Sequence, residues 1–281
     1  MTPRLFALTL LSLLAFAGNS LLCRIALKQT PIDPTSFVAI RLLSGALILW
    51  LVLYLQRQSR NLEGSWFGAL ALLAYAMTFA YAYSQIPAGT GALLLFASIQ
   101  ISMILYGLII GERLSFLQSI GVAFAVSGLV MLMLPSVGAP PLFYGFLMIV
   151  SGIAWSAYSV AGRGSRNPAS ATAGNFIRAT PIALVLFLLQ FQASHVDLDP
   201  TGVIYAVASG AVTSGLGYIL WYAALKELKV THAATVQLSV PVLTAFGGAL
   251  FLGEAVTQIL VAASALIILG VSLVVLVKRR A

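Results

Sequence analysis

Two long stretches of the sequence carry no charged residue, and this feature most constrains the possible folds. Asp, Glu, Lys and Arg are all absent from Gly64 to Gly111 and from Leu114 to Gly162. Each stretch is about 50 residues long, enough for two membrane-spanning helices of about 20 residues each. A β-barrel would instead need alternating segments of about 10 residues with polar positions facing the lumen. The chain is therefore predicted to be an all-α integral membrane protein.

Ten transmembrane helices are predicted, and they use most of the chain. Only 8% of the 281 residues are charged, against about 25% in a typical soluble domain. The connecting loops are too short for a soluble catalytic domain, and the sequence has no phosphate-binding GxxxxGK[ST] loop. Charges, Pro and Gly breaks and polar clusters place the helices at 5–23, 35–55, 66–84, 89–110, 116–134, 143–162, 172–191, 202–222, 231–251 and 257–277.

The first apolar segment has some features of a secretory signal peptide. Arg4 precedes an apolar run, and Ala15-Phe16-Ala17 resembles a cleavage site. The run continues through Leu21 and Leu22, however, and the segment has a counterpart in the second half of the chain. We therefore expect it to be a transmembrane helix.

Lys and Arg gather on one side of the predicted membrane. Of the 15 such residues, 11 lie near the termini or in loops on one side. Only Arg24 and Lys28 lie on the other side, while Arg41 and Arg178 lie inside helices. The positive-inside rule then predicts cytoplasmic N- and C-termini. Because topology accounts for the net charge of +8, we expect no nucleic-acid partner.

The sequence also contains an internal repeat. One constant offset aligns Gly111-Glu112 with Gly253-Glu254, and a slightly smaller one aligns Arg41 with Arg178. The repeat divides the chain into residues 1–137 and 138–281, with five predicted helices in each half. An odd number of helices makes the second half enter the membrane from the opposite face. Inverted repeats of this kind allow secondary transporters to alternate access around a central site.

Taken together, these features resemble the drug/metabolite transporter superfamily, and within it the EamA-type exporters. The shared features are ten helices, short loops, Gly-Glu after the fourth helix of each half and an Arg early in each second helix. The resemblance covers essentially the whole chain and is nearest to the YddG-type exporters of aromatic and other neutral amino acids. It implies a cavity lined by the first, third, fourth, sixth, eighth and ninth helices, with the fifth and tenth outside.

One position departs from the family pattern. The family often has Pro in the middle of the fourth helix of each half. Here Pro241 is present in the second half, but its equivalent in the first half is Ile99. A proline kink is therefore expected in one half only.

Four charged residues within or at the ends of helices have alternative roles. Arg41 and Arg178 lie about 9 Å into their helices, where a guanidinium can reach the lipid headgroups as an anchor or pair with a substrate carboxylate. Glu112 and Glu254 each follow a Gly at a helix end, where they can satisfy helix N-termini or carry protons. For the two arginines the resemblance favours the structural role, since the pattern occurs in family members with unlike substrates. For the two glutamates, repeat symmetry and their position at helix ends favour it.

Amides and aromatic rings within the helices are candidates for substrate binding. An amide that faces lipid is costly, so these side chains should face the interior. An aromatic lining suits an apolar or aromatic substrate, although interhelical packing or an interfacial belt would give the same pattern. The predicted substrate-binding residues are Asn19, Tyr75, Phe79, Tyr83, Gln100, Trp155, Tyr158, Tyr218, Trp221, Gln237 and Ser239.

A secondary transporter is the function class that this sequence favours. A membrane zinc protease needs HExxH, and an aspartyl protease needs two intramembrane Asp residues; the chain has neither set. A channel is the alternative from another class, although no TVGYG-type filter or acidic ring is visible. We expect alternating-access export of small neutral or amphiphilic metabolites across the bacterial inner membrane, chiefly aromatic and other neutral amino acids. A multidrug or other metabolite carrier is the alternative within the superfamily.

The expected partners are a small-molecule substrate and the lipid bilayer. We expect no catalytic residue, cofactor or metal, because the lone cysteine, Cys23, excludes a multi-cysteine site. A monomer suffices for transport, and the oligomeric state is left open. No Asp or Glu lies in the middle of a predicted helix, and only His232, near a helix end, titrates close to neutral pH. Obligatory proton antiport through a buried carboxylate is therefore not expected.

Overall fold

The computed structural model describes residues 2–56, 62–111, 114–134, 140–162, 165, 167–193, 196–225, 237 and 239–276. All of its regular structure within these ranges is helical. The helices are α1 (Pro3–Gln29), α2 (Pro34–Leu55), α3 (Trp66–Tyr83), α4 (Ala88–Ile109), α5 (Phe116–Met133), α6 (Leu142–Gly162), α7 (Pro168–Ala193), α8 (Pro200–Ala208), the π-helix η1 (Ser209–Leu216), α9 (Gly217–Leu225), α11 (Ser239–Leu252) and α12 (Gln258–Leu276).

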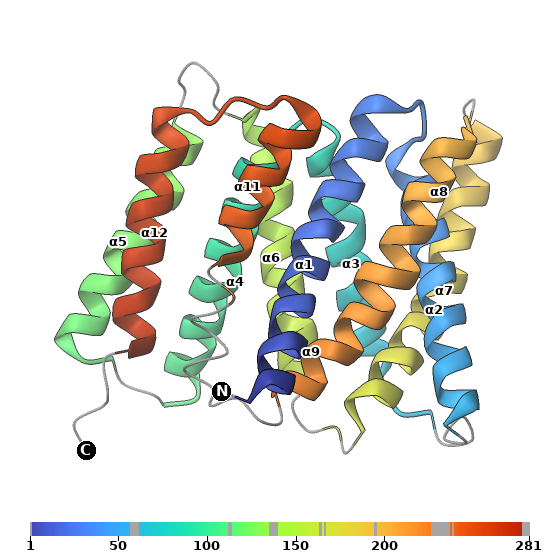
Figure 1. Ribbon diagram of the computed structural model, residues 1–281, viewed down its shortest axis with the longest axis horizontal. Coiled ribbons are helices and arrows are strands. Elements are labelled where there is room, and N and C mark those ends of the chain that lie inside the picture. The colour runs from blue at the N-terminus through green and yellow to red at the C-terminus, as the bar shows by residue number, and fades with distance from the viewer. Residues whose placement is uncertain are drawn as a thin grey trace.

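The prediction of an all-α membrane protein is confirmed. Because α8, η1 and α9 follow one another without a break, the described residues form ten helical rods. Seven of these rods are long and apolar enough to cross a membrane, and the other three are shorter apolar helices. The described ends of the chain, at the start of α1 and the end of α12, lie on the same side of the molecule (Figure 1).

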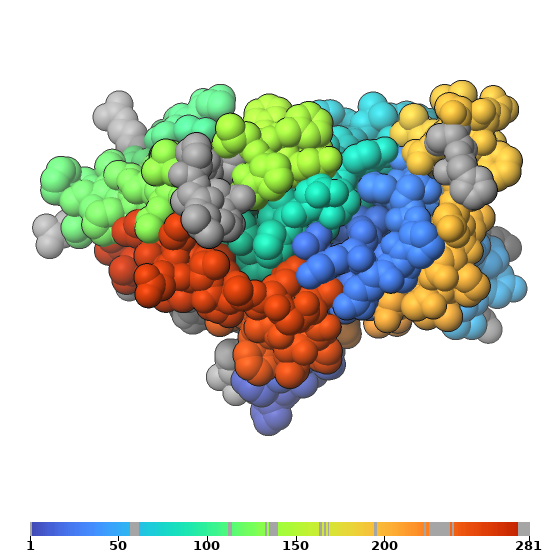
Figure 2. Space-filling model, turned by 90° about the horizontal axis from the view of Figure 1, so that it is seen from above, coloured from blue at the N-terminus to red at the C-terminus, as the bar shows by residue number. Residues whose placement is uncertain are grey.

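The rods pack in pairs that join the two halves of the chain. Contacts link α5 to α12, α2 to α7 and α4 to α11. Helix α6 packs against α3 and α4, and its repeat counterpart α1 packs in the same way against α9 and α11. Such matched pairs are what a two-fold relation between five-helix units produces. The α5–α12 pair stands at one end of the molecule, at the left of both views (Figures 1 and 2).

The first helix extends beyond its predicted end at residue 23. It continues to Gln29 and includes Arg24 and Lys28. The sequence suggested an end there because charged residues are excluded from the apolar bilayer. In the structure, Arg24 is buried against Glu254, so its charge is neutralised within the protein.

The π-helix η1 lies in the middle of the eighth predicted span. Its sequence, Ser209 to Leu216, contains two glycines, and a third follows at Gly217. A Cβ atom on Gly210 would collide with the carbonyl oxygen of Arg41 and with Ser44 Oγ, so η1 and α2 approach closely at this point. π-helical turns occur often at functional sites.

The backbone conformation at Gly111 and Gly253 explains why each repeated Gly-Glu pair begins with glycine. Gly111 and Gly253 follow the last turns of α4 and α11, with φ angles of 91° and 63°. This left-handed region suits glycine, which has no Cβ atom, and it commonly ends helices. Pro241 is the third residue of α11. The helical turn before it lies largely outside the described residues, so the predicted kink is not tested.

Candidate functional site

A small cavity of about 30 Å³ lies where helices of both halves meet. Its walls come from α1, α3, α4, α6 and α9, and from the isolated described residue 237. Residue 237 falls in the ninth predicted helix and α9 in the eighth, so the walls come from the six helices that were expected to line a cavity. Pockets that hold drug-sized ligands measure about 300–1,000 Å³, so this cavity is well below that size. Its lining residues are Phe16, Asn19, Ser20, Tyr75, Phe79, Leu95, Phe96, Ile99, Trp155, Tyr218 and Gln237.

A continuous series of aromatic rings surrounds this cavity. Tyr75 of α3 lies 5.2 Å from Phe79 and 4.8 Å from Trp155 of α6, measured between ring centroids. Trp155 lies 5.1 Å from Tyr218 of α9, which in turn contacts Phe16 of α1 at 6.1 Å. Tilted and edge-to-face rings at these separations stabilise one another. The series therefore forms an aromatic wall to which both halves of the chain contribute.

Asn19 occupies the centre of a polar network beside this wall. Its Oδ1 atom accepts a hydrogen bond from Ser209 Oγ at 2.8 Å and longer ones from Thr213 and Ser214, at 3.4 Å each. Its Nδ2 atom donates to the hydroxyl of Tyr75 at 3.3 Å. All three hydroxyl donors lie on η1, so the π-helix supplies the partners of this amide. Asn19 thus faces the interior as predicted and joins α1 to α3 and η1.

Arg41 lies immediately behind the aromatic wall. The residue is only 1% exposed, so it does not reach the lipid headgroups, and the snorkelling expected from its position is wrong. Its Cζ atom lies 5.4 Å from the centroid of the Tyr75 ring and 5.3 Å from that of Phe79. Its Nε atom donates to Ser214 Oγ at 3.2 Å, and Nη2 donates to the Tyr75 hydroxyl at 3.4 Å.

Arg178, the repeat counterpart of Arg41, has different surroundings. Its Nη1 atom donates to the carbonyl oxygens of Glu63 at 3.2 Å and Gly174 at 2.9 Å. The bond to Glu63 ties α7 to the segment that precedes α3, and the bond to Gly174 lies within α7. Arg178 is therefore a structural anchor. Although the repeat aligns it with Arg41, the two guanidinium groups bind different partners.

Six of the eleven predicted substrate-binding residues line the cavity, and five do not. Tyr83 packs behind Phe79 with ring centroids 4.6 Å apart, and Tyr158 packs behind Trp155 at 5.4 Å. Trp221 contacts the lining residue Phe16 at 5.6 Å. Gln100 and Ser239 are half-buried and lie outside the lining. The six that line the cavity are Asn19, Tyr75, Phe79, Trp155, Tyr218 and Gln237.

Five of the lining residues were not predicted from the sequence. Phe16 and Ser20 share a helical face with Asn19, so the 3.6-residue period could have identified them. Leu95, Phe96 and Ile99 are apolar residues of an almost wholly apolar helix. No local pattern separates the cavity-facing side of that helix from its packed side.

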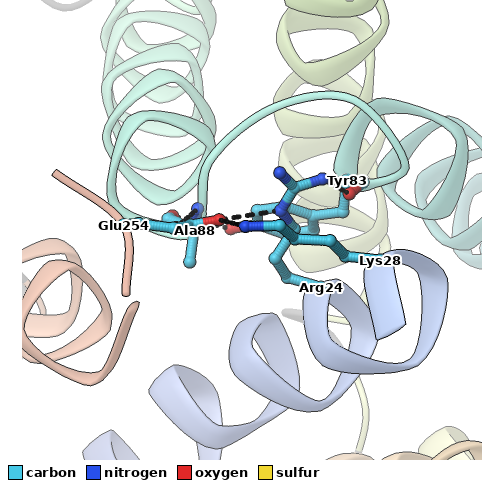
Figure 3. A network of polar contacts seen from close by, with 5 residues as sticks. All are labelled: Arg24, Lys28, Tyr83, Ala88 and Glu254. Carbon is cyan, nitrogen blue, oxygen red and sulfur yellow. Dashed lines mark hydrogen bonds and ion pairs between the residues drawn. The ribbon is translucent and has the colours of Figure 1, made fainter. Parts of the chain in front are cut away.

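Glu254, which belongs to the second half of the chain, binds residues of the first half (Figure 3). Its Oε2 atom accepts a hydrogen bond of 2.6 Å from the backbone N–H of Ala88, the first residue of α4. Its Oε1 atom lies 2.9 Å from Nε of Arg24 and 4.0 Å from Nζ of Lys28. Arg24 also donates to the carbonyl of Tyr83, the last residue of α3, at 2.8 Å. The structural role predicted for Glu254 is confirmed, while Glu112 and His232 lie outside the described residues.

Comparisons with known proteins agree with this architecture. Residues 4–134 and 142–276 both match the model of the EamA-like transporter family. An uncharacterized Pseudomonas aeruginosa protein, PA1977, is 50% identical over 96% of this chain and 94% of its own length. One solved crystal structure shares the fold with a TM-score of 0.69 and 21% identity, over 98% of this chain and 99% of that one.

Two more distant relatives have names that describe a substrate. A probable amino-acid metabolite efflux pump of Salmonella typhimurium is 26% identical over 73% of this chain and 71% of its own length. A probable terminal-alkyne amino-acid exporter of Streptantibioticus cattleyicolor is 25% identical over 76% of this chain and 71% of its own length.

Proposed function

This chain belongs to the EamA-like transporter family. We propose that it exports small neutral or amphiphilic metabolites, above all aromatic and other neutral amino acids. The chain is a multi-pass membrane protein and a secondary transporter, not an enzyme. Its bacterial relatives indicate the cytoplasmic membrane. In the proposed mechanism, residues 1–137 and 138–281 form two inverted halves that alternate access to a shared central site.

The aromatic wall around Asn19 is the observation that carries this proposal. Rings of Phe16, Tyr75, Trp155 and Tyr218 offer apolar faces for a substrate side chain, and aromatic pairs gain energy beyond simple burial. The amide of Asn19 adds a polar group that can bind an amine or a carboxylate. An apolar pocket with a few polar groups is typical of small-molecule sites.

Two further findings support the choice. The cavity of about 30 Å³ is too small for an amino acid, so the proposed transport requires the lining helices to move before a solute enters. Alternating access requires such a movement. The names of the two distant relatives, an efflux pump for amino-acid metabolites and an amino-acid exporter, favour amino acids as the substrate class.

Counterflow into liposomes tests this proposal. Vesicles that contain the purified protein are loaded with unlabelled L-phenylalanine, and uptake of the labelled compound is followed. We expect saturable uptake that prefers the L-enantiomer and that L-leucine, but not L-lysine or L-glutamate, inhibits. Uptake of unrelated cationic dyes without amino-acid counterflow would favour a multidrug carrier, and non-saturating ion conductance would favour a channel.

A further inference from the structure

The buried guanidinium of Arg41 has no anionic partner among the described residues, and we propose that it binds the carboxylate of the transported solute. The inference rests on the proposed function and deepens it, because it names the group that the site recognises. Three observations support it: the charge of Arg41, its hydrogen bonds and its contacts with two rings that line the cavity.

The charge of Arg41 is not compensated by any described carboxylate. Arginine stays protonated at all physiological pH values, and this side chain is almost completely buried. Within the described ranges, ion pairs of 4.0 Å or less involve only Glu254, with Arg24 and Lys28. A buried charge without a partner is costly, and ionisable residues retained within a membrane generally serve a function.

Two hydrogen-bond donors next to each other are unused. Nη1 of Arg41 is buried and has no hydrogen-bond partner among the described residues. The hydroxyl of Tyr75 accepts bonds from Arg41 Nη2 and Asn19 Nδ2, and within the described chain no acceptor takes its own hydrogen. A carboxylate has two oxygens that only accept hydrogen bonds. It could therefore bind the guanidinium with one oxygen and the phenol with the other.

The guanidinium packs against two side chains that line the cavity. Tyr75 and Phe79 both line the cavity, and Cζ of Arg41 lies within 5.4 Å of each ring centroid. The cation–π contacts partly compensate its charge. For a solute in the expanded cavity to reach Arg41, the Tyr75 and Phe79 rings would have to move aside.

Arg178 provides a matched comparison within the same chain. It is equivalent to Arg41 in the repeat, but its guanidinium is bound to the carbonyl oxygens of Glu63 and Gly174. These acceptors are fixed parts of the backbone. A carboxylate site at Arg178 would have to displace them, so the proposed recognition belongs to one half only.

Ligand binding to the purified full-length protein in detergent tests the proposal. Three probes share a phenyl ring: 3-phenylpropionate has only a carboxylate, phenethylamine has only an amine, and L-phenylalanine has both. We expect 3-phenylpropionate and L-phenylalanine, but not phenethylamine, to raise the melting temperature. The Arg41→Gln substitution should weaken binding of both carboxylates at least tenfold. Arg178→Gln should leave their affinities within about twofold of the wild type.

Two milder variants keep the test decisive if Arg41→Gln does not fold. Tyr75→Phe keeps the ring and removes the phenol donor, and Arg41→Lys keeps the charge and removes the planar fork. Each should weaken carboxylate binding severalfold and leave any phenethylamine binding unchanged. Unchanged carboxylate affinity in folded Arg41 and Tyr75 variants would overturn the proposal.

The probes also separate this inference from the proposed function. If 3-phenylpropionate binds through Arg41 but L-phenylalanine is not transported, the proposed function fails and the carboxylate site stands. If L-phenylalanine is transported and phenethylamine binds as well as the carboxylates do, the inference fails and the function stands. Failure of both carboxylates to bind the wild-type protein would overturn the inference.

Discussion

Arg24 Nε and Glu254 Oε1 lie 2.9 Å apart in a buried ion pair, and each side chain is only 8% exposed. Arg24 belongs to α1, in the first half, and Glu254 to the connection between α11 and α12, in the second. The same carboxylate binds the first backbone N–H of α4, and Pro87 before it provides no side-chain cap. One residue of the second half therefore caps a helix of the first.

Substitution of Glu254 should strongly destabilise the protein. Glu254→Gln leaves Arg24 buried without a counter-charge, and removing one partner of a buried ion pair costs about 3–5 kcal/mol. The free energy of unfolding in mixed micelles measures this loss. Glu63→Gln is the control, because among the described residues the partners of the Glu63 carboxylate are Ser165 Oγ and the Asn167 N–H, from which a Gln side-chain oxygen can also accept hydrogen bonds.

A double-mutant cycle separates the ion pair from the other contacts of Glu254. Arg24→Gln combined with Glu254→Gln should cost less than the sum of the two single substitutions, because the double variant leaves no unpaired buried charge. Strict additivity would show that the two residues act independently, contrary to the geometry.

The close contact between η1 and α2 predicts an unusual sensitivity at Gly210. A methyl group added there would collide with the Arg41 carbonyl and Ser44 Oγ, so Gly210→Ala should destabilise the fold by about 1–3 kcal/mol. Thermal unfolding measures this effect. Gly18→Ala is the matched control, since its added methyl would lie 3.4 Å from Thr213 Cγ2, an ordinary contact distance. Equal melting temperatures for the two variants would contradict this account.

The sequence predicted the helices well because the bilayer imposes a simple rule on them. Apolar stretches about 20 residues long must form helices in lipid, and the predicted 66–84 and 116–134 closely match Trp66–Tyr83 and Phe116–Met133. The aromatic spacing in α3 also identified Tyr75 and Phe79 as cavity residues. Local period and composition were sufficient for these results.

The surroundings of the charged residues could not be predicted in the same way. Burial of Arg41 depends on α3 and η1, which are distant from it in sequence, so its position within α2 suggested a path to the headgroups instead. Nor does any apolar or polar period indicate that residues 209–216 form a π-helix. Its three hydroxyl donors to Asn19 are visible only once the helices are packed.

Substitutions in the aromatic wall should reduce transport without unfolding the protein. Trp155→Ala removes the ring that joins Tyr75 to Tyr218, and Asn19→Ala removes the central amide of the polar network. We expect each to lower counterflow of L-phenylalanine at least tenfold, with a folded yield within about twofold of the wild type. Trp50, an exposed residue that stacks on Tyr54, gives the control Trp50→Ala. Unchanged transport in both test variants would remove Trp155 and Asn19 from the site.

Membrane orientation is a separate prediction from the distribution of Lys and Arg. A reporter that is active only in the cytoplasm should be active when fused after Ala281. A periplasm-specific reporter inserted at residues 195–199 should also be active, because this loop is predicted on the outer side. Activity of the opposite reporter at either position would invert the predicted topology.

Transport should not require a proton gradient. A proton-driven carrier usually needs a titratable group that moves between the two access states. Among the described residues, the carboxylates of Asp33, Glu63, Asp197, Asp199 and Glu254 lie at helix ends or in connections rather than in the middle of a membrane-spanning helix. Arg41 cannot serve, because it does not release its proton at physiological pH. We therefore expect counterflow of L-phenylalanine at equal pH on both sides to match that with an imposed gradient within about twofold. Loss of counterflow without a gradient, together with loss of the remaining activity in His232→Ala, would instead identify His232 as the coupling residue.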